Sequence, residues 1–305
     1  MIDASLLPAL FTLMTVARSG SVGAAARLRH RTSSAISQQI RRLEVHFGVK
    51  LVERAGRGIR LTAAAEAALP SIVELSDESE AIFARLAELA GRPVTTLRVA
   101  VSDYLGKALL APVMRGLLDD RAPLRFEIVT AHSREATRLL ARGDVDLAVV
   151  TGGDAGRDLE SQHLFDQPFA WVGVRRSRGA RVPLTERLRR EPVIRLSPDS
   201  QGRRLLDDFL DREGIHPAST IDVPSVSLML GYISGGLGIG LAPALALAEA
   251  PPGRVVSERA RVPALPVSLV SRPVLHRTPA ATRFVARLAV EGRRAGQRLT
   301  RLHTT

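Results

Sequence analysis

The N-terminal part of the chain alternates apolar and polar positions with the period of an α-helix. From Thr32 onward, apolar side chains recur at helical spacing, which predicts a helix with one face packed inward. That face is formed by Ile36, Ile40, Leu43 and Phe47. The segment before it, 22–28, contains Ala24, Ala25 and Ala26, whose small side chains let two helices approach closely. The pattern predicts a compact helical unit at the start of the chain.

A short β-hairpin is expected after these helices. Leu51 and Val52, and then Ile59 and Leu61, predict two strands around a tip at 55–58. Three arginines would line this tip, namely Arg54, Arg57 and Arg60. Guanidinium groups suit phosphates and a narrow minor groove, so the tip has the chemistry of a DNA contact.

The polar face of the predicted helix carries side chains suited to DNA. Short hydroxyl and amide groups can hydrogen-bond base edges, and an arginine beside them can reach a guanine or a phosphate. Thr32 is the expected N-cap, and the free N–H groups behind it suit a phosphate oxygen. The candidate DNA-binding residues are Arg31, Thr32, Ser33, Ser34, Ser37, Gln38, Arg41, Arg42, Arg54, Arg57 and Arg60. A helical bundle with a solvated charged face is the alternative interpretation.

The charge distribution strengthens the DNA interpretation. Residues 1–62 contain ten Lys and Arg residues against three acids, a net charge of +7, whereas residues 63–91 carry −5. The whole chain carries +12, so the positive charge is densest in the predicted DNA-binding unit. The high isoelectric point alone is weak support, because arginine is used throughout the chain and only Lys50 and Lys107 are lysines.

Residues 63–91 are expected to form one long amphipathic helix. They are rich in alanine and acids, and their apolar positions are Leu69, Ile72, Val73, Leu75, Ile82, Leu86 and Leu89. Pro70 inside the segment predicts a kink or a local break. Because the helix has little to pack against in its own chain, a partner helix from a second subunit is expected. A surface helix on its own domain is the alternative. Gly91-Arg92-Pro93 ends the helix and begins a hinge.

From Thr96 short β-rich runs alternate with helical segments, which predicts an α/β fold with a mainly parallel sheet. The predicted strands are 97–101, 125–130, 145–150, 169–174, 193–196, 237–241 and 267–270. The predicted helices are 106–119, 133–142, 225–234 and one that starts at about Pro279. Two crossings, near 166–169 and 263–267, divide the region into two lobes. The first covers about 96–167 and 267–290, and the second covers about 168–266.

Hydroxyl-rich junctions between strands and helices are the candidate ligand site. Ligands of open α/β sheets bind beyond the carboxyl ends of strands, where helix N-termini converge, and such a site suits a small anion or polar metabolite. The candidate effector-binding residues are Ser102, Asp103, Thr130, His132, Ser133, Thr151, Ser197, Asp199, Ser200, Ser225 and Val226. The alternative for each Ser or Thr is an N-cap. Asp103 fits a pure anion site poorly, and either favours an amine or caps the following helix.

Several other chemistries are disfavoured. The chain has no cysteine, which excludes disulfides, thiol catalysis and Cys-ligated zinc. Its histidines show no paired metal-ligand spacing, so we expect neither a metal nor a cofactor. The glycine-rich run 235–240 leads from a helix into a strand, the reverse of a dinucleotide-binding loop. With no Gly-x-Ser-x-Gly elbow and no Walker loop in the sequence, we expect no enzymatic activity.

A membrane location is also disfavoured. No apolar run approaches the ~18–20 residues of a membrane span. The apolar stretch Leu6–Ala17 has the spacing of a packed helix, and Asp3 precedes it where a secretory signal would have basic residues. We therefore expect a cytoplasmic protein without membrane contact.

The segment Ser21–Thr62 resembles the N-terminal domain of LysR-type transcriptional regulators. The matching residues are Phe11, Gly20-Ser21, Ala25-Ala26, Leu28, Ser34-Ala35-Ile36-Ser37, Gln39-Ile40-Arg41-Arg42-Leu43-Glu44, Gly48-Val49, Leu51, Glu53-Arg54 and Leu61-Thr62. Two positions depart from the family pattern. Thr32-Ser33-Ser34 stands where the family commonly has Ser-Gln-Pro, and Thr62-Ala63-Ala64-Ala65 stands where it has Thr-x-x-Gly. The second change favours helix continuity, because alanine is the better helix former by ~1 kcal/mol.

The resemblance implies a complete architecture over essentially all 305 residues. It implies an N-terminal all-α winged helix-turn-helix domain over 1–62, a linker and dimerisation helix over 63–91, and an α/β effector domain over 92–305. That last domain would be two-lobed and similar to periplasmic binding proteins.

The function implied is sequence-specific regulation of transcription at a pseudo-palindromic site on double-stranded DNA. The protein would act as a dimer or a dimer of dimers (a homotetramer), with two recognition helices about 34 Å apart. A small polar or anionic effector would modulate it, and RNA polymerase is a further partner. The alternatives are a small-molecule-binding or enzymatic α/β domain with an accessory helical module, and a nucleoid protein without sequence preference.

Overall fold

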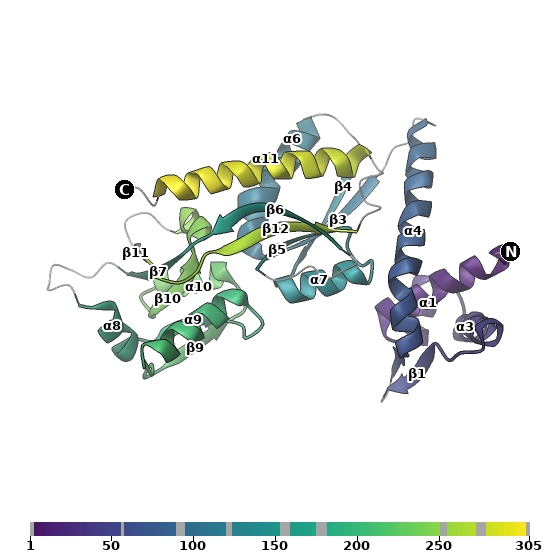
Figure 1. The fold of residues 1–305 in the computed structure, drawn as a ribbon, viewed down its shortest axis with the longest axis horizontal. Helices are drawn as coiled ribbons and strands as arrows, with labels where there is room; N and C mark the ends of the chain where they lie inside the picture. Colours follow the sequence, from purple (N-terminus) through teal and green to yellow (C-terminus); the bar gives the residue numbers. More distant parts are fainter. Residues whose placement is uncertain are drawn as a thin grey trace.

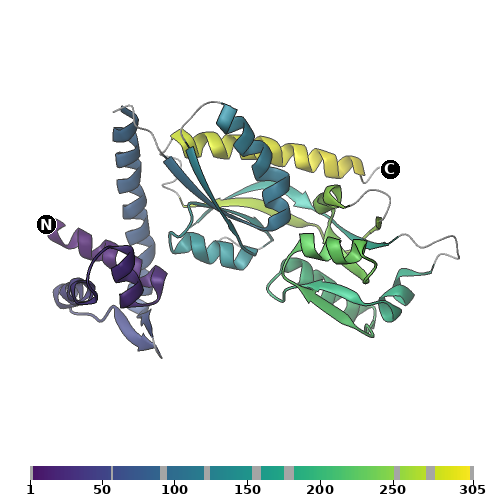
Figure 2. The same ribbon diagram turned by 180° about the vertical axis from the view of Figure 1, so that it is seen from behind.

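A computed structural model describes residues 3–55, 58–89, 95–119, 124–152, 159–174, 182–250, 255–272 and 279–302. The chain forms an N-terminal helical head, a long helix, and a two-sheet α/β region (Figure 1). The view from behind shows the same order along the long axis of the molecule, with the head at one end (Figure 2).

The head consists of three α-helices, a 3₁₀ turn before them and a two-stranded hairpin after them. The elements are η1 (Ala4–Leu6), α1 (Leu7–Ser19), α2 (Val22–Leu28), α3 (Ser33–Phe47), β1 (Val52–Ala55) and β2 (Gly58–Leu61). Side-chain N-caps begin the second and third helices. Ser21 Oγ accepts from the Ala24 N–H at 3.1 Å, and Thr32 Oγ1 accepts from the Ala35 N–H at 3.2 Å. Gly48 ends α3 in the left-handed conformation, with φ of 67°.

The predicted apolar face of α3 is buried except at its last turn. Ile36 and Leu43 are fully buried and Ile40 is almost fully buried against α1 and α2. Phe47 was expected on the same face, but 55% of it is exposed. The prediction for Phe47 is wrong because it belongs to the last turn of α3, where the buried cluster of the head no longer covers the helix.

Helix α4 (Ala63–Leu89) is continuous through Pro70, and the expected local break is absent. It runs as a single straight rod in Figure 1. Pro70 lacks the N–H that would bond to the carbonyl of Glu66. Both residues lie on an exposed side of the helix, so water can satisfy that carbonyl without a break.

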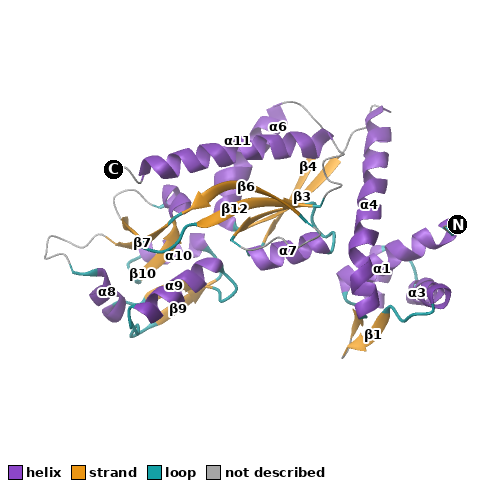
Figure 3. Ribbon diagram, in the orientation of Figure 1, coloured by secondary structure: helices purple, strands orange, loops and turns teal. Residues whose placement is uncertain are grey.

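Two five-stranded sheets form the α/β region (Figure 3). The first lobe has the order β4-β3-β5-β12-β6, from β3 (Thr95–Val101), β4 (Leu124–Thr130), β5 (Leu147–Thr151), β6 (Glu160–Gln167) and β12 (Leu265–Ser271). The second lobe has the order β11-β7-β10-β8-β9, from β7 (Phe169–Val174), β8 (Val193–Leu196), β9 (Thr220–Val223), β10 (Ile239–Pro243) and β11 (Val255–Arg259). The chain passes from one sheet to the other at Pro168 and returns between β11 and β12.

The sheets are mixed, which corrects the prediction of a mainly parallel sheet. Strand β3 pairs parallel with β4 and β5, and β8 pairs parallel with β9 and β10. Strand β12 is antiparallel to β5 and β6, and β7 is antiparallel to β10 and β11. The antiparallel pairs arise because strands that cross between the lobes enter the neighbouring sheet in the opposite direction.

Helices cover both sheets, and the closing helix spans the back of the first lobe. In the first lobe, α6 (Ala111–Asp119) and α11 (Pro279–Leu302) pack on one face of the sheet around the fully buried Phe284, and α7 (Ser133–Ala141) packs on the other face through Ala136 and Leu140 (Figures 1 and 2). The helices are α5 (Asp103–Leu105), the π-helical turn η2 (Gly106–Leu110), α6 (Ala111–Asp119), α7 (Ser133–Ala141), α8 (Leu184–Arg190), α9 (Gln201–Arg212), α10 (Val226–Ser234), the 3₁₀ helix η3 (Ala244–Glu249) and α11 (Pro279–Leu302).

The predicted strands and helices are all present, with ends shifted by a few residues. The helix expected over 106–119 begins at Asp103, and the strand expected over 237–241 lies at 239–243. The elements β6, β9, β11, α8 and α9 had not been predicted. None of the helices in the described ranges is both long and apolar enough to cross a membrane.

Candidate nucleic-acid interface and ligand pocket

The polar residues of α3 form an exposed face beside the first turn of the helix. All of the helix candidates are exposed, namely Arg31, Thr32, Ser33, Ser34, Ser37, Gln38, Arg41 and Arg42. Thr32 Oγ1 also lies 3.0 Å from Ser34 Oγ. The first turn of α3 therefore presents hydroxyls and unpaired backbone N–H groups together, which is the chemistry that base edges and phosphates accept.

The two arginines of this face differ in their contacts. Arg42 Nη2 donates to Ser5 Oγ at 2.6 Å, so η1 and α3 share this side chain. Among the described residues, Arg41 makes no ion pair or hydrogen bond within the protein. The Arg41 guanidinium is therefore available for DNA, whereas the Arg42 guanidinium would have to divide its N–H donors between Ser5 and DNA.

The hairpin is fixed to the turn that joins α1 and α2. The Ile59 N–H donates to the Gly20 carbonyl at 3.2 Å, and a Cβ at Gly58 would lie 2.9 Å from the same oxygen. Glycine at position 58 is therefore required for this close approach. The turn between α1 and α2 thus determines where the hairpin lies in the head.

The arginines of the hairpin do not all line its tip. Arg60 lies directly across the two strands from Glu53, and its Nε donates to Glu53 Oε1 at 2.5 Å. Arg54 is exposed and has no hydrogen-bond or ion-pair partner among the described residues, and Arg57 lies outside those residues. The prediction that Arg60 lines the tip is corrected, because strand register places it opposite an acid.

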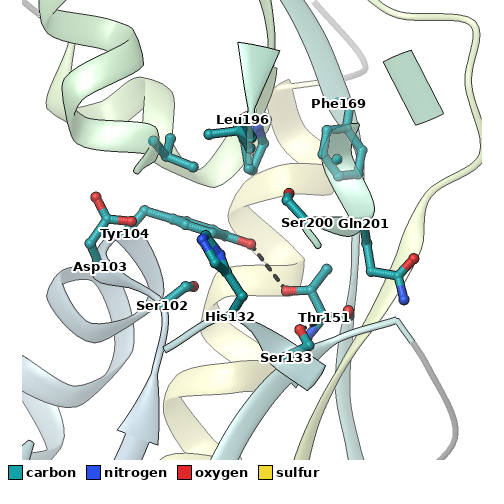
Figure 4. Close-up of a pocket in the computed structure, with 13 residues that line it drawn as sticks. Ser102, Asp103, Tyr104, His132, Ser133, Thr151, Phe169, Leu196, Ser200 and Gln201 are labelled. Atoms are coloured by element: carbon teal, nitrogen blue, oxygen red, sulfur yellow. Dashed lines mark hydrogen bonds between the residues drawn. The ribbon is translucent and has the colours of Figure 1, made fainter. Parts of the chain in front are cut away.

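A pocket lies between the lobes (Figure 4). The first lobe contributes Ser102, Asp103, Tyr104, His132, Ser133 and Thr151. The second lobe contributes Phe169, Leu196, Ser200, Gln201, Gly202, Val226 and Pro243. Ser102 follows β3 and Thr151 is the last residue of the neighbouring parallel strand β5, so their side chains meet at one sheet edge.

Seven of the predicted effector-binding residues line this pocket. They are Ser102, Asp103, His132, Ser133, Thr151, Ser200 and Val226. The N-terminal residues of three helices face it, namely Ser133 of α7, Gln201 of α9 and Val226 of α10. Their unpaired N–H groups provide hydrogen-bond donors and positive dipole ends toward the cavity.

Four predicted residues lie elsewhere, so the structure gives no support for them as pocket residues. Thr130 is exposed at the end of the edge strand β4. Ser225 caps α10, with its Oγ accepting from the Leu228 N–H at 3.2 Å. Ser197 lies in a turn, where its carbonyl accepts from the Ser200 N–H. Asp199 is exposed and faces Arg134.

Six lining residues are not in the predicted effector-binding set, namely Tyr104, Phe169, Leu196, Gln201, Gly202 and Pro243. For two of them the sequence gives a weak indication, because Tyr104 follows two predicted residues and Phe169 lies at the predicted crossing. Tyr104 Oη lies 3.2 Å from Thr151 Oγ1 across the cavity wall. Burial raises the pKa of Tyr104 to about 12, so its phenol remains neutral over the physiological range.

The polar groups of the pocket favour hydrogen bonding. The half-buried position of Asp103 opposes ionisation, but hydrogen bonds from Ser227 and from the Tyr104 backbone, with Lys107 nearby, keep the pKa of Asp103 below its ordinary value. Ser102 Oγ is buried without a hydrogen-bond partner among the described residues, which leaves a hydroxyl for a ligand.

The metal-binding potential of the chain is low where it is described. Across the described ranges, no group of three or more His, Asp and Glu side chains is placed to hold a metal ion. The residues that line the pocket suit a small molecule bound by hydroxyls, helix N-termini and apolar contacts.

A winged helix-turn-helix connected by one helix to a two-lobed domain with a pocket between its lobes defines a class of DNA-binding proteins that carry their own ligand-binding domain. Residues 7–66 match the family described as bacterial regulatory helix-turn-helix protein, lysR family, and residues 90–292 match the LysR substrate binding domain. The chain belongs to the LysR family of transcriptional regulators.

The chain is similar to known proteins in sequence and in fold. The chain is 28% identical over 266 residues to the HTH-type transcriptional regulator TfdS of Cupriavidus pinatubonensis, over 84% of this chain and 88% of that protein. ArgP from Mycobacterium tuberculosis has a similar fold, with a TM-score of 0.73, 23% identity, and coverage of 96% of this chain and 98% of that one. DarR of Vibrio fischeri, solved in complex with DNA, has a TM-score of 0.55, 19% identity, and coverage of 95% and 99%. The family match and TfdS, which is named as a transcriptional regulator, agree with the prediction of a regulator rather than an enzyme.

Proposed function

We propose that this regulator reads a specific double-stranded DNA operator through α3 and the β1–β2 hairpin, and that a small polar or anionic effector in the inter-lobe pocket modulates its action. The observation that carries the proposal is the exposed hydroxyl, amide and arginine face of α3, capped by Thr32, beside a hairpin fixed to the head. Ser33 and Arg41, like Ser37 and Gln38, make no side-chain hydrogen bond or ion pair within the described part of the chain.

The pocket supports the effector part of the proposal. Helix N-termini and free hydroxyls suit carboxylate, phosphate or carbonyl oxygens, whereas Asp103 adds a negative charge at one wall. A ligand that has both an acidic group and a hydrogen-bond donor would satisfy the helix N-termini and Asp103 together. Arg134 and Asp199, 3.4 Å apart, also bridge the lobes near the cavity, so ligand occupancy and lobe closure are linked.

Self-association through α4 is the third part. Ile82, Phe83 and Leu86 are large apolar side chains that are more than half exposed near the end of this helix. A partner helix would cover them, which supports a dimer and then a dimer of dimers. Two-fold symmetry would place two recognition helices about 34 Å apart on a pseudo-palindromic site. Such a protein would work in the cytoplasm and affect RNA polymerase at a promoter.

The test is selection of bound duplexes from a random DNA pool, followed by footprinting and salt titration. The expected result is one enriched pseudo-palindrome, and a log–log salt slope of roughly −5 if about six phosphates are neutralised. Equal affinity for the enriched duplex and a scrambled duplex of the same composition would reject sequence-specific reading and leave a nucleoid-type protein.

A further inference from the structure

Helix α7 contacts the ligand pocket with its first turn. His132 and Ser133 line the cavity (Figure 4). Ser133 Oγ donates to the Thr151 carbonyl at 3.0 Å and accepts from the Thr151 N–H at 2.9 Å, which fixes the helix start to the end of β5. A ligand in the cavity would contact this junction from both elements.

The other end of α7 is held by a buried arginine. Arg272, which follows β12, is only 5% exposed. Its Nη1 donates to the carbonyls of Leu140 and Val145 at 2.5 and 2.9 Å, so it joins the last turn of α7 to the chain that leads into β5. The guanidinium thus satisfies helix C-terminal carbonyls that would otherwise lack donors.

The same guanidinium reaches α4. Arg272 Nη2 donates to Asp77 Oδ1 at 3.0 Å, and Arg272 Nε donates to Asp77 Oδ2. Asp146 Oδ1 lies 4.0 Å from Arg272 Nη2. One buried side chain therefore binds α7, the chain that leads into β5 and the helix that carries the DNA-binding head.

Two further contacts secure the turn after α7. Gly143 has φ of 74°, and a Cβ there would lie 3.1 Å from Val73 Cγ1 on α4, so the turn packs directly on that helix. Arg18 Nε of α1 lies 2.5 Å from Asp144 Oδ1. The turn is thus in contact with both the head and α4, and one end of α7 lies next to α4 in both ribbon views (Figures 1 and 2).

We propose that Arg272 is a positioning residue that couples the ligand pocket to the DNA-binding head, with α7 as the connecting element and Asp77 as the acceptor on α4. This inference rests on the proposed function, since it assigns the route by which pocket occupancy alters DNA binding. A buried guanidinium cannot leave its acceptors without a large desolvation cost. When α7 shifts at the pocket, Arg272 therefore moves with it and displaces Asp77, because the hydrogen bonds of the guanidinium are kept and not broken.

Because coupling between two sites is reciprocal, the test needs no effector. Hydrogen–deuterium exchange is measured on the full-length protein, comparing wild type with Asp77→Asn. The matched control is Glu74→Gln, an exposed acid on the same helix. Asp77→Asn leaves the Arg272 contacts to both carbonyls in place, so the lobe remains folded where an Arg272 variant could fail to fold.

The expected result is exchange about tenfold faster at pocket-end amides, the fold-change for loss of a charge-assisted hydrogen bond. The amides to follow are those of Ala136 and Thr151, which donate to the His132 carbonyl and to Ser133 Oγ. Glu74→Gln should leave both unchanged. A response to Asp77→Asn confined to α4 and the 142–146 turn would overturn the coupling and leave Arg272 as a local cap.

A second variant tests the opposite direction. Ser133→Ala removes the pocket-end anchor and should accelerate exchange around Asp77 on α4, and an unchanged α4 would also overturn the proposal. Affinity of wild type for the selected operator is measured in parallel. If wild type shows no specific DNA binding, the proposed function fails. If it binds and the pocket-end amides ignore Asp77→Asn, only the coupling fails.

Discussion

Asp103 of the first lobe accepts a hydrogen bond from the backbone N–H of Ser227 in the second lobe, with 2.9 Å between Oδ2 and N. Lys107 Nζ donates to Ser227 Oγ at 2.6 Å beside it. The start of α10 is therefore held against the first lobe by an ionised carboxylate and an ammonium group. This contact adjoins the pocket, so the carboxylate both lines the cavity and holds the lobes together.

The Asp103 contact predicts a pH-dependent stability. The folded-state pKa of Asp103 is below its ordinary value, so its contribution is present above about pH 4 and is lost as the pH falls through the folded-state pKa. Asp103→Asn should lower stability at neutral pH by ~1 kcal/mol and flatten this acid dependence. Unfolding is followed by the fluorescence of Trp171, the single tryptophan, which is buried in the second lobe. Asp199→Asn, on the exposed inter-lobe pair, is the control, and an equal effect of both variants would contradict the assignment.

Arg41→Ala should weaken operator binding and reduce the magnitude of the salt slope by about one if Arg41 binds a phosphate. If it binds a guanine instead, the loss is about 1–3 kcal/mol and is specific to one base position. Fluorescence anisotropy at several salt concentrations distinguishes the two. Arg190→Ala removes another exposed positive charge, from the second lobe, and should change neither quantity.

Thr32→Ala and Ser33→Ala should distinguish the contribution of the start of α3 to the stability of the head from its contribution to DNA recognition. Thr32 caps the helix, so its loss should cost ~1 kcal/mol of head stability. Ser33 is exposed and is not the cap, so Ser33→Ala should keep the stability and lower operator affinity. Thermal unfolding and gel-shift titration measure the two effects. Wild-type affinity of Ser33→Ala would remove Ser33 from the reading surface.

Leu86→Glu should weaken self-association at least about tenfold, because a charge replaces a leucine that a partner helix would bury. Sedimentation velocity over a concentration series gives the dissociation constant. Val290→Glu places the same charge on a partly exposed apolar site of α11 and serves as the control. Association that resists Leu86→Glu would place the dimer contact away from this end of α4.

The Tyr104 phenol should ionise late, near pH 12. Because its folded-state pKa is raised, the stability it contributes is complete below about pH 10 and declines as the pH rises toward the folded-state value. Ultraviolet titration of phenolate absorbance should lose its last step in Tyr104→Phe. A step that survives this substitution would mean that Tyr104 is solvated in solution.

Local features could be predicted from the sequence, and features that depend on distant neighbours could not. Thr32 as an N-cap and the inward face of Ile36 and Leu43 follow from spacing within one helix, and the structure has both. The exposure of Phe47 depends on where the buried cluster of the head ends. The pairing of Arg60 with Glu53 depends on strand register.

The pocket shows the same division. The rule that ligands bind beyond strand ends located Ser102 and Thr151, because β3 and β5 are neighbouring parallel strands. It could not separate a cap such as Ser225 from a lining residue, since both occupy helix starts. Phe169 and Pro243 were missed because the sequence alone does not distinguish an apolar residue that contacts a ligand from one in the core. Only the packing of the second lobe places these two at the cavity.

Because α4 is unbroken, a tilt of the helix near Asp77 displaces its first residues, which adjoin the DNA-binding head. From Asp77 back to Ala63 the helix spans about 21 Å at 1.5 Å per residue. A tilt of about ten degrees at Asp77 would displace the start of α4 by about 4 Å, close to the 3.4 Å step between stacked base pairs. A break at Pro70 would have dissipated that motion. Movements too small to rearrange the pocket would then be large enough, at the other end, to change which bases α3 can reach.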